Sequence, residues 1–136
     1  MRREEEIRYW AGLAKYDFGV AQTLLESKKY VYALFFARLG VEKMLKALFV
    51  RINGSTPPPT HNLLRLAAEA RLDLSEDDRE FLRGLMEFNI EARYPRDVRK
   101  VRKISTKKFT EQTLGQVKQW RKRLAAEIGK KRKSSD

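Results

Sequence analysis

Polar residues that could hold an anionic ligand are set into the most apolar stretch of the chain, residues 30–51. If this stretch is helical, Arg38, Glu42 and Lys46 follow one another at four-residue intervals and form one strip. Further along, Arg93 offers a permanently charged guanidinium fork that suits phosphate, and Tyr94 could stack on a base or donate its hydroxyl. The candidate ligand-binding residues are therefore Asp17, Glu42, Lys43, Lys46, Arg93 and Tyr94.

The same residues also fit a purely structural explanation, a buried polar network that fixes the register of the helices. Asp17 is the clearest case, because it interrupts an apolar stripe of the first predicted helix. Burying its carboxylate without a partner would be expensive, so we expect Lys43 or Arg93 to pair with it. Both explanations, structural network and ligand pocket, stay open at this point.

Catalytic chemistry has few candidates. The chain has one histidine, and the candidate acid–base groups are Arg93 and His61. His61 equally fits a hydrogen bond that anchors its own loop. With no cysteine and a single histidine, thiolate and multi-histidine metal sites are excluded, and no nucleotide-binding fingerprint is present. We therefore expect no metal and no cofactor.

The elements that position these residues are predicted to be helices. Apolar residues recur with helical periodicity, and no stretch alternates as a half-buried strand would. We expect an all-α chain that forms an antiparallel up-and-down four-helix bundle with an extra short helix, five helices in total. Residues 95–105 are predicted to be an exposed connection. The predicted helices are 4–26, 30–52, a short one over 61–70 capped by Thr60, one that follows Ser75 and stops before Pro95, and one from Ser105 or Thr106 to 128.

The stretch 30–51 is apolar almost all the way round, which is typical of a helix buried on more than one side. In a chain of 136 residues, we expect it to pack against helices of its own chain and against a second copy. The strip of Arg38, Glu42 and Lys46 is then predicted to lie near a subunit interface or beside a cleft formed by Arg93.

The positive charge is concentrated in the last third of the chain. Residues 1–92 contain 14 Lys and Arg against 14 Asp and Glu, whereas residues 93–136 contain 16 against 4, which accounts for the net charge of +12. Such a segment suits a polyanion such as nucleic acid, although it could also be only solubilising. We expect residues 1–128 to form one domain and residues 129–136 a basic, disordered tail. The candidate polyanion contacts are Arg96, Arg99, Lys100, Arg102, Lys103, Arg121, Lys122, Lys130, Lys131 and Arg132.

Membrane association is not predicted. Charged residues interrupt the best apolar run, so no uncharged stretch of about 18 residues exists. The first ten residues include three acids and lack the apolar centre of a signal peptide. We expect a cytoplasmic location.

Five short motifs occur along the chain in a fixed order and spacing. They are Ala14 to Asp17 with Ala21, Tyr30-x-x-Ala33-x-Phe35-Phe36, Glu42-Lys43-x-x-Lys46-Ala47, Thr60-His61-Asn62-Leu63 and Ala92-Arg93-Tyr94-Pro95. Together they resemble the HEPN family of small all-α domains, and the resemblance extends from about Tyr9 to Ile128. It implies a five-helix up-and-down bundle that dimerises, associates with nucleotide or RNA, and often pairs with a minimal nucleotidyltransferase in toxin–antitoxin systems.

Ribonucleases of this family carry an Arg-x4–6-His motif, from which this sequence departs. The nearest arginine upstream of His61 is Arg51, ten positions before it, and no histidine follows Arg93. The sequence therefore resembles the branch without the ribonuclease motif. It predicts a homodimeric binding or regulatory module that partners a nucleotidyltransferase. The alternatives are an RNA-cleaving toxin with a divergent site centred on Arg93, and a nucleic-acid-binding protein that acts through its basic C-terminal third.

Overall fold

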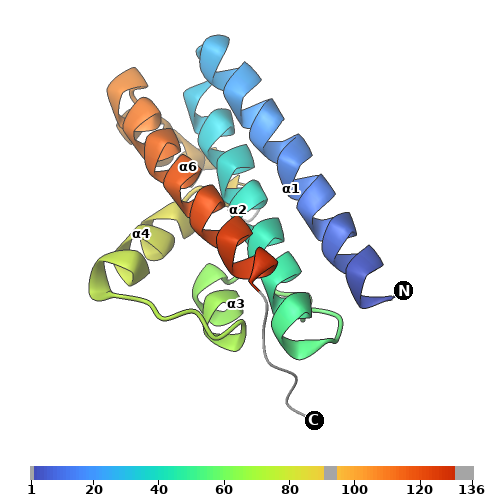
Figure 1. The fold of residues 1–136 in the computed structure, drawn as a ribbon. Helices are drawn as coiled ribbons and strands as arrows, with labels where there is room; N and C mark the ends of the chain where they lie inside the picture. The colour runs from blue at the N-terminus through green and yellow to red at the C-terminus, as the bar shows by residue number, and fades with distance from the viewer. Residues whose placement is uncertain (1, 91–94, 131–136) are drawn as a thin grey trace.

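The structure, a computed structural model, describes residues 2–90 and 95–130. These residues form helices and connections without any strand, so the all-α prediction is confirmed (Figure 1). Three helices are long and three are short. They are α1 (Arg3–Glu26), α2 (Tyr30–Asn53), α3 (Leu63–Glu69), α4 (Glu76–Met86), α5 (Pro95–Ile104) and α6 (Lys107–Gly129).

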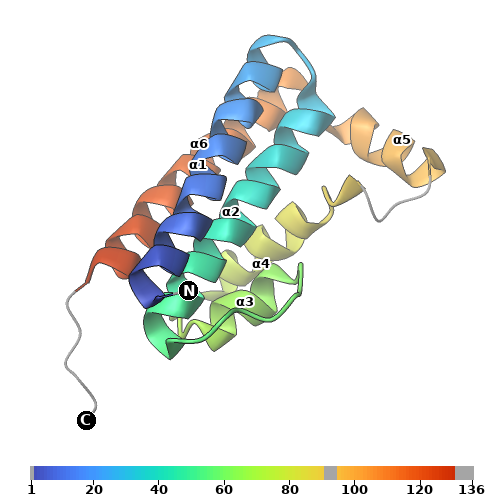
Figure 2. The same cartoon turned by 90° about the vertical axis from the view of Figure 1, so that its right-hand side faces the viewer.

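Helix α2 is the centre of the fold. It contacts each of the other five helices, and 15 of its 24 residues are buried. Figures 1 and 2 show α1 and α6 running along α2, with α3 and α4 grouped on one side of it. The continuous apolar surface of α2 requires this arrangement, because a helix without a polar face must be covered all round. The prediction that α2 packs against several helices of its own chain is confirmed.

The predicted antiparallel hairpin of α1 and α2 is confirmed. A three-residue turn joins the helices, and Lys28 within it adopts the left-handed conformation with φ 61°. Gly40 of α2 lets the two helices approach closely, since a Cβ atom there would lie 2.5 Å from the ring of Phe18. Gly54 ends α2 with φ 67°, a conformation that glycine adopts without strain.

The two short helices α3 and α4 begin with clear caps. The prediction that Thr60 caps α3 is wrong: Asn62 does so, because its side-chain oxygen accepts a hydrogen bond from Arg65 N at 3.0 Å. The predicted start of α4 at Ser75 is confirmed, and Ser75 and Asp78 form a reciprocal capping box.

The prediction that α4 runs on to Pro95 is wrong, since α4 ends at Met86. The chain turns at this point so that Phe88 packs with Val31, Leu34 and Val101 in a small apolar cluster separate from the main core. That contact joins residues far apart in the sequence, and it outweighs the local preference for a longer helix.

The predicted exposed connection 95–105 is helical instead, so the described chain has six helices and not five. Three sequence features explain α5: Pro95 occupies the first helical position, Asp97 lies in the first turn, and Arg102 and Lys103 lie in the last. Val101 fixes the helix to the body of the protein through the cluster with Phe88. Figure 2 shows α5 projecting from the end of the bundle near the turn between α1 and α2.

Helix α6 completes the core. Thr106 caps it, one of the two residues predicted to do so, and its buried side includes Val117, Trp120 and Leu124. Trp120 stacks on Phe81 of α4, with ring centroids 5.9 Å apart. None of the helices in the described ranges is long and apolar enough to cross a membrane. Most of the predicted tail, residues 131–136, lies outside the described residues.

The contact between Gly40 and Phe18 generates a test. We expect Gly40→Ala to lower the free energy of unfolding by about 1–3 kcal/mol, because the new methyl group must displace a buried ring. The matched control is Gly115→Ala in α6, where a Cβ meets no atom within 4 Å and the substitution should be neutral or stabilise by up to ~1 kcal/mol. Urea denaturation measures both. Equal effects of the two substitutions would contradict the proposed close approach.

Candidate functional site

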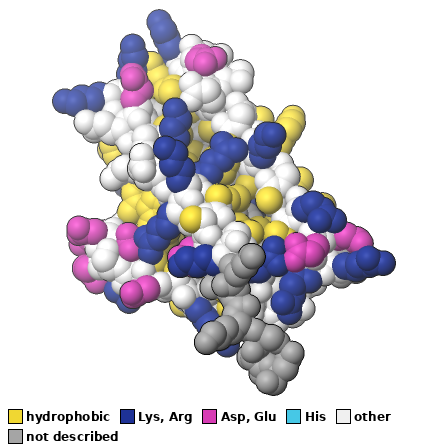
Figure 3. Space-filling view, viewed as in Figure 1, with side chains coloured by type: hydrophobic (Ala, Val, Ile, Leu, Met, Phe, Trp, Pro, Cys, Tyr) yellow, Lys and Arg dark blue, Asp and Glu magenta, His cyan; other side chains and the backbone are white. Residues whose placement is uncertain are grey.

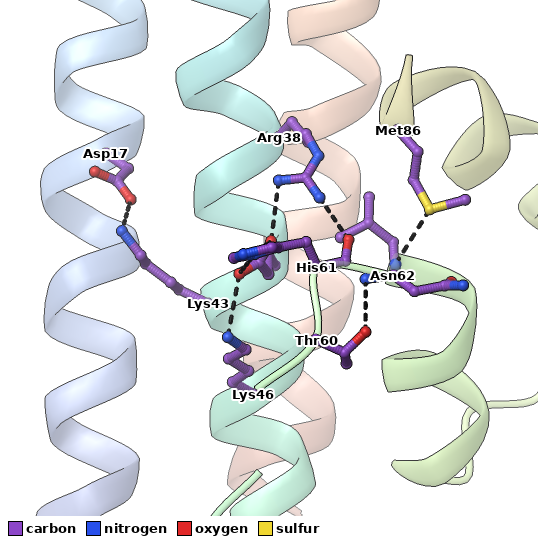
Figure 4. A network of polar contacts seen from close by, with 10 residues as sticks. Asp17, Arg38, Lys43, Lys46, Thr60, His61, Asn62 and Met86 are labelled. Atoms are coloured by element: carbon purple, nitrogen blue, oxygen red, sulfur yellow. Dashed lines mark hydrogen bonds and ion pairs between the residues drawn. The ribbon is translucent and has the colours of Figure 1, made fainter. Parts of the chain in front are cut away.

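The strip of charged residues on α2 is a buried network. Arg38 Nη1 donates a hydrogen bond of 2.9 Å to Glu42 Oε1, and Lys46 Nζ lies 3.1 Å from Glu42 Oε2. The three residues are only 1%, 2% and 7% exposed. Figure 4 shows Arg38 and Lys46 on α2, beside the segment that leads into α3. Charges this deeply buried must be paired, and here each is.

The loop between α2 and α3 covers this network. Its three consecutive prolines keep it extended, and Pro57 is buried against the protein. At its end, Arg38 Nη2 donates to the backbone carbonyl of His61. The His61 ring lies above the carboxylate, with Nδ1 3.1 Å from each oxygen of Glu42, while its outer side leaves the side chain 68% exposed (Figure 4).

The electrostatics of Glu42 follow from this enclosure. Burial pushes the pKa of its carboxyl group up, but the hydrogen bond with His61 and the charges of Lys46 and Arg38 outweigh burial and hold the pKa below 4.5. Both carboxylate oxygens are occupied by these partners. A carboxylate in this state is a poor general base. The geometry therefore favours the structural explanation of the network, while direct ligand contact by Glu42 and Lys46 stays a prediction.

A second charged pair lies between α1 and α2. Lys43 Nζ donates a hydrogen bond to Asp17 Oδ2, so one of the two predicted partners of Asp17 is confirmed. Lys46 also lies over the Trp10 ring, with Nζ 5.0 Å from its centroid. Figure 4 shows the Asp17–Lys43 pair between α1 and α2, whereas Arg38 and Lys46 face the segment that leads into α3. Arg93 and Tyr94 lie outside the described residues.

Most of the predicted polyanion contacts are on the surface. Arg121 and Lys122 are exposed on α6, while Lys130 pairs with Glu127 at 2.7 Å. The side chain of Arg96, and Lys131 and Arg132 altogether, lie outside the described part of the chain. The exposed candidates on α5 are Arg99, Lys100, Arg102 and Lys103.

Sequence reasoning missed two groups of residues, one buried and one on the surface. Arg38 was placed in the strip but not among the site candidates, although its four-residue spacing from Glu42 was the available signal. Lys28 and Lys29, in the turn before α2, were missed because the fold alone brings them to Arg102. Together they line an open depression of about 460 Å³ with Tyr30, Val31, Tyr32 and Ser105.

Metal chemistry finds no support in residues 2–90 and 95–130, where no three His, Cys, Asp or Glu side chains are grouped so as to hold an ion. Glu42 and His61 contact one another directly, with Nδ1 of His61 3.1 Å from each carboxylate oxygen. What the network can do is hold a loop and a helix in register.

The network predicts a large effect of removing its anion. We expect Glu42→Gln to lower the free energy of unfolding by about 3 kcal/mol, because Arg38 and Lys46 would be left buried without a counter-charge. The control is Glu69→Gln, which breaks an exposed pair with Arg65 and should cost less than ~1 kcal/mol. Chemical denaturation at neutral pH measures both, and similar small losses would show that the network is energetically unimportant.

The same variant has a defined pH dependence. Since folding lowers the pKa of Glu42 below 4.5, its contribution to stability is complete above that value and is lost as pH falls through the lower folded pKa. The difference in Tm between wild type and Glu42→Gln should therefore be largest near neutral pH and shrink in acid. The pKa values of Glu4 and Asp78 are also lowered, but both residues are present in both proteins, so their contributions cancel in the difference in Tm.

Comparisons with known proteins agree with this architecture. The crystal structure of TT1696 from Thermus thermophilus matches with a TM-score of 0.75 and 25% sequence identity, covering 93% of this chain and 99% of that one. No curated protein matches the sequence. A family model described as the HEPN domain matches residues 7–126, which include all six helices wholly or in large part. The chain therefore belongs to the HEPN domain family.

Proposed function

We propose that this HEPN domain protein is a non-catalytic binding module that associates with RNA through its basic surface. In this proposal it acts as the regulatory partner of a minimal nucleotidyltransferase, in a system of the toxin–antitoxin type. The observation that carries the proposal is the set of exposed cations on α5 and on the turn between α1 and α2, which meet at one end of the bundle.

These cations are available to a ligand. Within the described ranges, Arg99, Lys100, Arg102 and Lys103 take part in no ion pair, and neither do Lys28 and Lys29. The depression that Lys28, Lys29 and Arg102 line contains no carboxylate. Tyr32, 42% exposed, lies at its edge and offers a ring on which a base could stack. A phosphate backbone with unpaired bases fits this combination of charge and aromatic surface.

Binding is favoured over cleavage by the position of His61. Acid–base cleavage of RNA needs a histidine and a cation that reach the same phosphodiester. Among the described residues, the guanidinium that contacts His61 is that of Arg38, which is 1% exposed and already donates to Glu42 and to the backbone of His61. It is not accessible to RNA. The alternative of an RNA-cleaving site centred on Arg93 is addressed by the experiment below.

RNA binding through α5 should depend strongly on salt. For a labelled single-stranded RNA, log Kd should change by about 0.7 per decade of salt for each phosphate neutralised, so Arg99→Gln/Lys100→Gln should lower the slope by about 1.4. The control is Arg79→Gln/Arg83→Gln, which removes the same charge from the exposed face of α4. Fluorescence anisotropy over a salt titration measures this.

Three outcomes would count against this proposal. A Kd that does not change with salt in the wild type would mean that the charges do not contact RNA. Equal changes in the two double variants would mean that only net charge matters. Cleavage of the RNA during long incubation, abolished by Arg93→Ala or by His61→Ala, would replace the binding module with the catalytic alternative.

Assembly is a separate part of the proposal. The chain's own loop covers the polar strip of α2, so we expect a second copy to use another surface. Tyr9 and Tyr16, 50% and 71% exposed on α1, are candidates for it. We expect the purified chain to elute as a dimer, and to elute together with a nucleotidyltransferase encoded next to it when the two are co-expressed. Size exclusion with light scattering measures both, and separate elution of the two proteins would remove the partner from the proposal.

A further inference from the structure

A groove runs between α1 and α6, on the side of α6 that faces away from α4. Trp120 and Arg123 on one side of α6 contact α4, whereas Leu114 and Arg121 on the other side line the groove. Its volume is about 410 Å³. The face in Figure 3, viewed as in Figure 1, has hydrophobic surface along its middle with Lys and Arg around it. The apolar lining consists of Phe18, Ala21, Ala37, Leu114 and Val117.

Three cations border this apolar lining: Lys15 on α1, and Lys118 and Arg121 on α6. Over residues 2–90 and 95–130, none of the three has an acidic partner. Arg123, only two residues from Arg121, shows the contrast, since its Nη1 lies 3.0 Å from Asp78 Oδ2. The groove therefore combines an apolar centre with positive charges that no acid of the described residues compensates.

Arg121 crosses the groove. Its guanidinium carbon lies 4.7 Å from the centroid of the Phe18 ring, so the side chain reaches from α6 to α1 over the apolar lining. A guanidinium held on an aromatic face keeps its N–H groups free at the edge for a carboxylate. The side chain is thereby positioned, before any partner arrives, where a bidentate ion pair would form.

We propose that this groove docks an amphipathic helix of a partner protein, with apolar residues on its inner face and Asp or Glu on its flanks. A groove between two helices that pack on a third is the site into which a further helix fits, with apolar anchors spaced three and four residues apart. The lining extends from Lys15 to Gln22 and from Leu114 to Arg121. Seven residues of helix span about 10 Å, which corresponds to two turns of a docked helix.

Two other occupants fit less well. A second copy of this chain carries a net charge of +12 and would bring the same three cations against themselves. A nucleic acid strand needs aromatic faces for its bases, but Phe18 is the only aromatic residue of the lining and Arg121 covers its ring. The inference does not rest on the proposed RNA binding, which uses the cations of α5 and of the turn before α2.

The test uses two synthetic helical peptides of about 18 residues, long enough to pass the groove at both ends. One has leucines along one face flanked by glutamates, and its twin has lysine in place of every glutamate. We expect the glutamate peptide to bind wild-type protein and the lysine peptide not to bind. Arg121→Glu should weaken binding of the glutamate peptide about tenfold, because one well-placed ion pair is lost. The variant should bind the lysine peptide more tightly than the wild type does.

The matched control is Lys122→Glu. It makes the same charge change on the neighbouring, exposed residue of α6, which does not line the groove, and should alter Kd less than about twofold. Fluorescence anisotropy gives the affinities. Circular dichroism should be unchanged in both variants because both side chains are exposed, so a folding defect is separable from a binding defect.

Several results would overturn the inference. Equal binding of the two peptides, or equal effects of Arg121→Glu and Lys122→Glu, would show that the groove does not recognise an acidic helix. Displacement of the glutamate peptide by single-stranded RNA, together with loss of RNA binding in Arg121→Glu, would assign the groove to a polyanion. A wild-type dimer that dissociates in Arg121→Glu but not in Lys122→Glu would assign it to a second copy.

Discussion

The burial of one carboxylate, that of Glu42, is the interaction on which the arrangement around α2 depends. A charge at this depth in a helix is tolerated only if cations and donors surround it. Arg38 and Lys46 supply positive charges from the same face of α2, and the ring of His61 contacts the carboxylate from a loop. Because Arg38 also needs an acceptor for its second nitrogen, the backbone of His61 must pass directly above it. The path of the loop into α3 is therefore determined by the charges of α2.

This dependence also explains which parts of the structure the sequence could predict. The apolar density of α2, the hairpin turn and the cap at Ser75 are local signals, and each predicted the element that forms. The four-residue spacing of Arg38, Glu42 and Lys46 predicted that they share a strip. The loop that covers this strip was not predictable, since the contact between Glu42 and His61 joins residues 19 positions apart and depends on how the chain between them folds back.

Helix α5 is the element that the sequence analysis did not predict. Its sequence has five basic residues among ten, which led to the prediction of an exposed connection. Val98, Val101 and Ile104 nevertheless recur at three-residue spacing, a helical signal that the prediction overlooked. What fixes the helix to the bundle is the burial of Val101 against Phe88, Val31 and Leu34, which come from two other parts of the chain. Phe88 can reach that cluster only because α4 stops at Met86. The same long-range apolar contact thus bears on both wrong predictions, because it accompanies the end of α4 and anchors α5.

The pairing of charges then separates residues that stabilise the fold from residues that can bind. Inside the bundle, Asp17 and Glu42 have cationic partners, so these charges are engaged before any ligand arrives. The surface differs, and α6 shows this within a single turn. Arg123 is held by Asp78 and by the carbonyl of Asp73, and it fastens α4 to the bundle. Within the described residues, Arg121 contacts the face of Phe18, which orients its guanidinium, and it pairs with no acid. Two arginines with the same chemistry therefore act differently, because in this described part of the chain only Arg123 faces an acid.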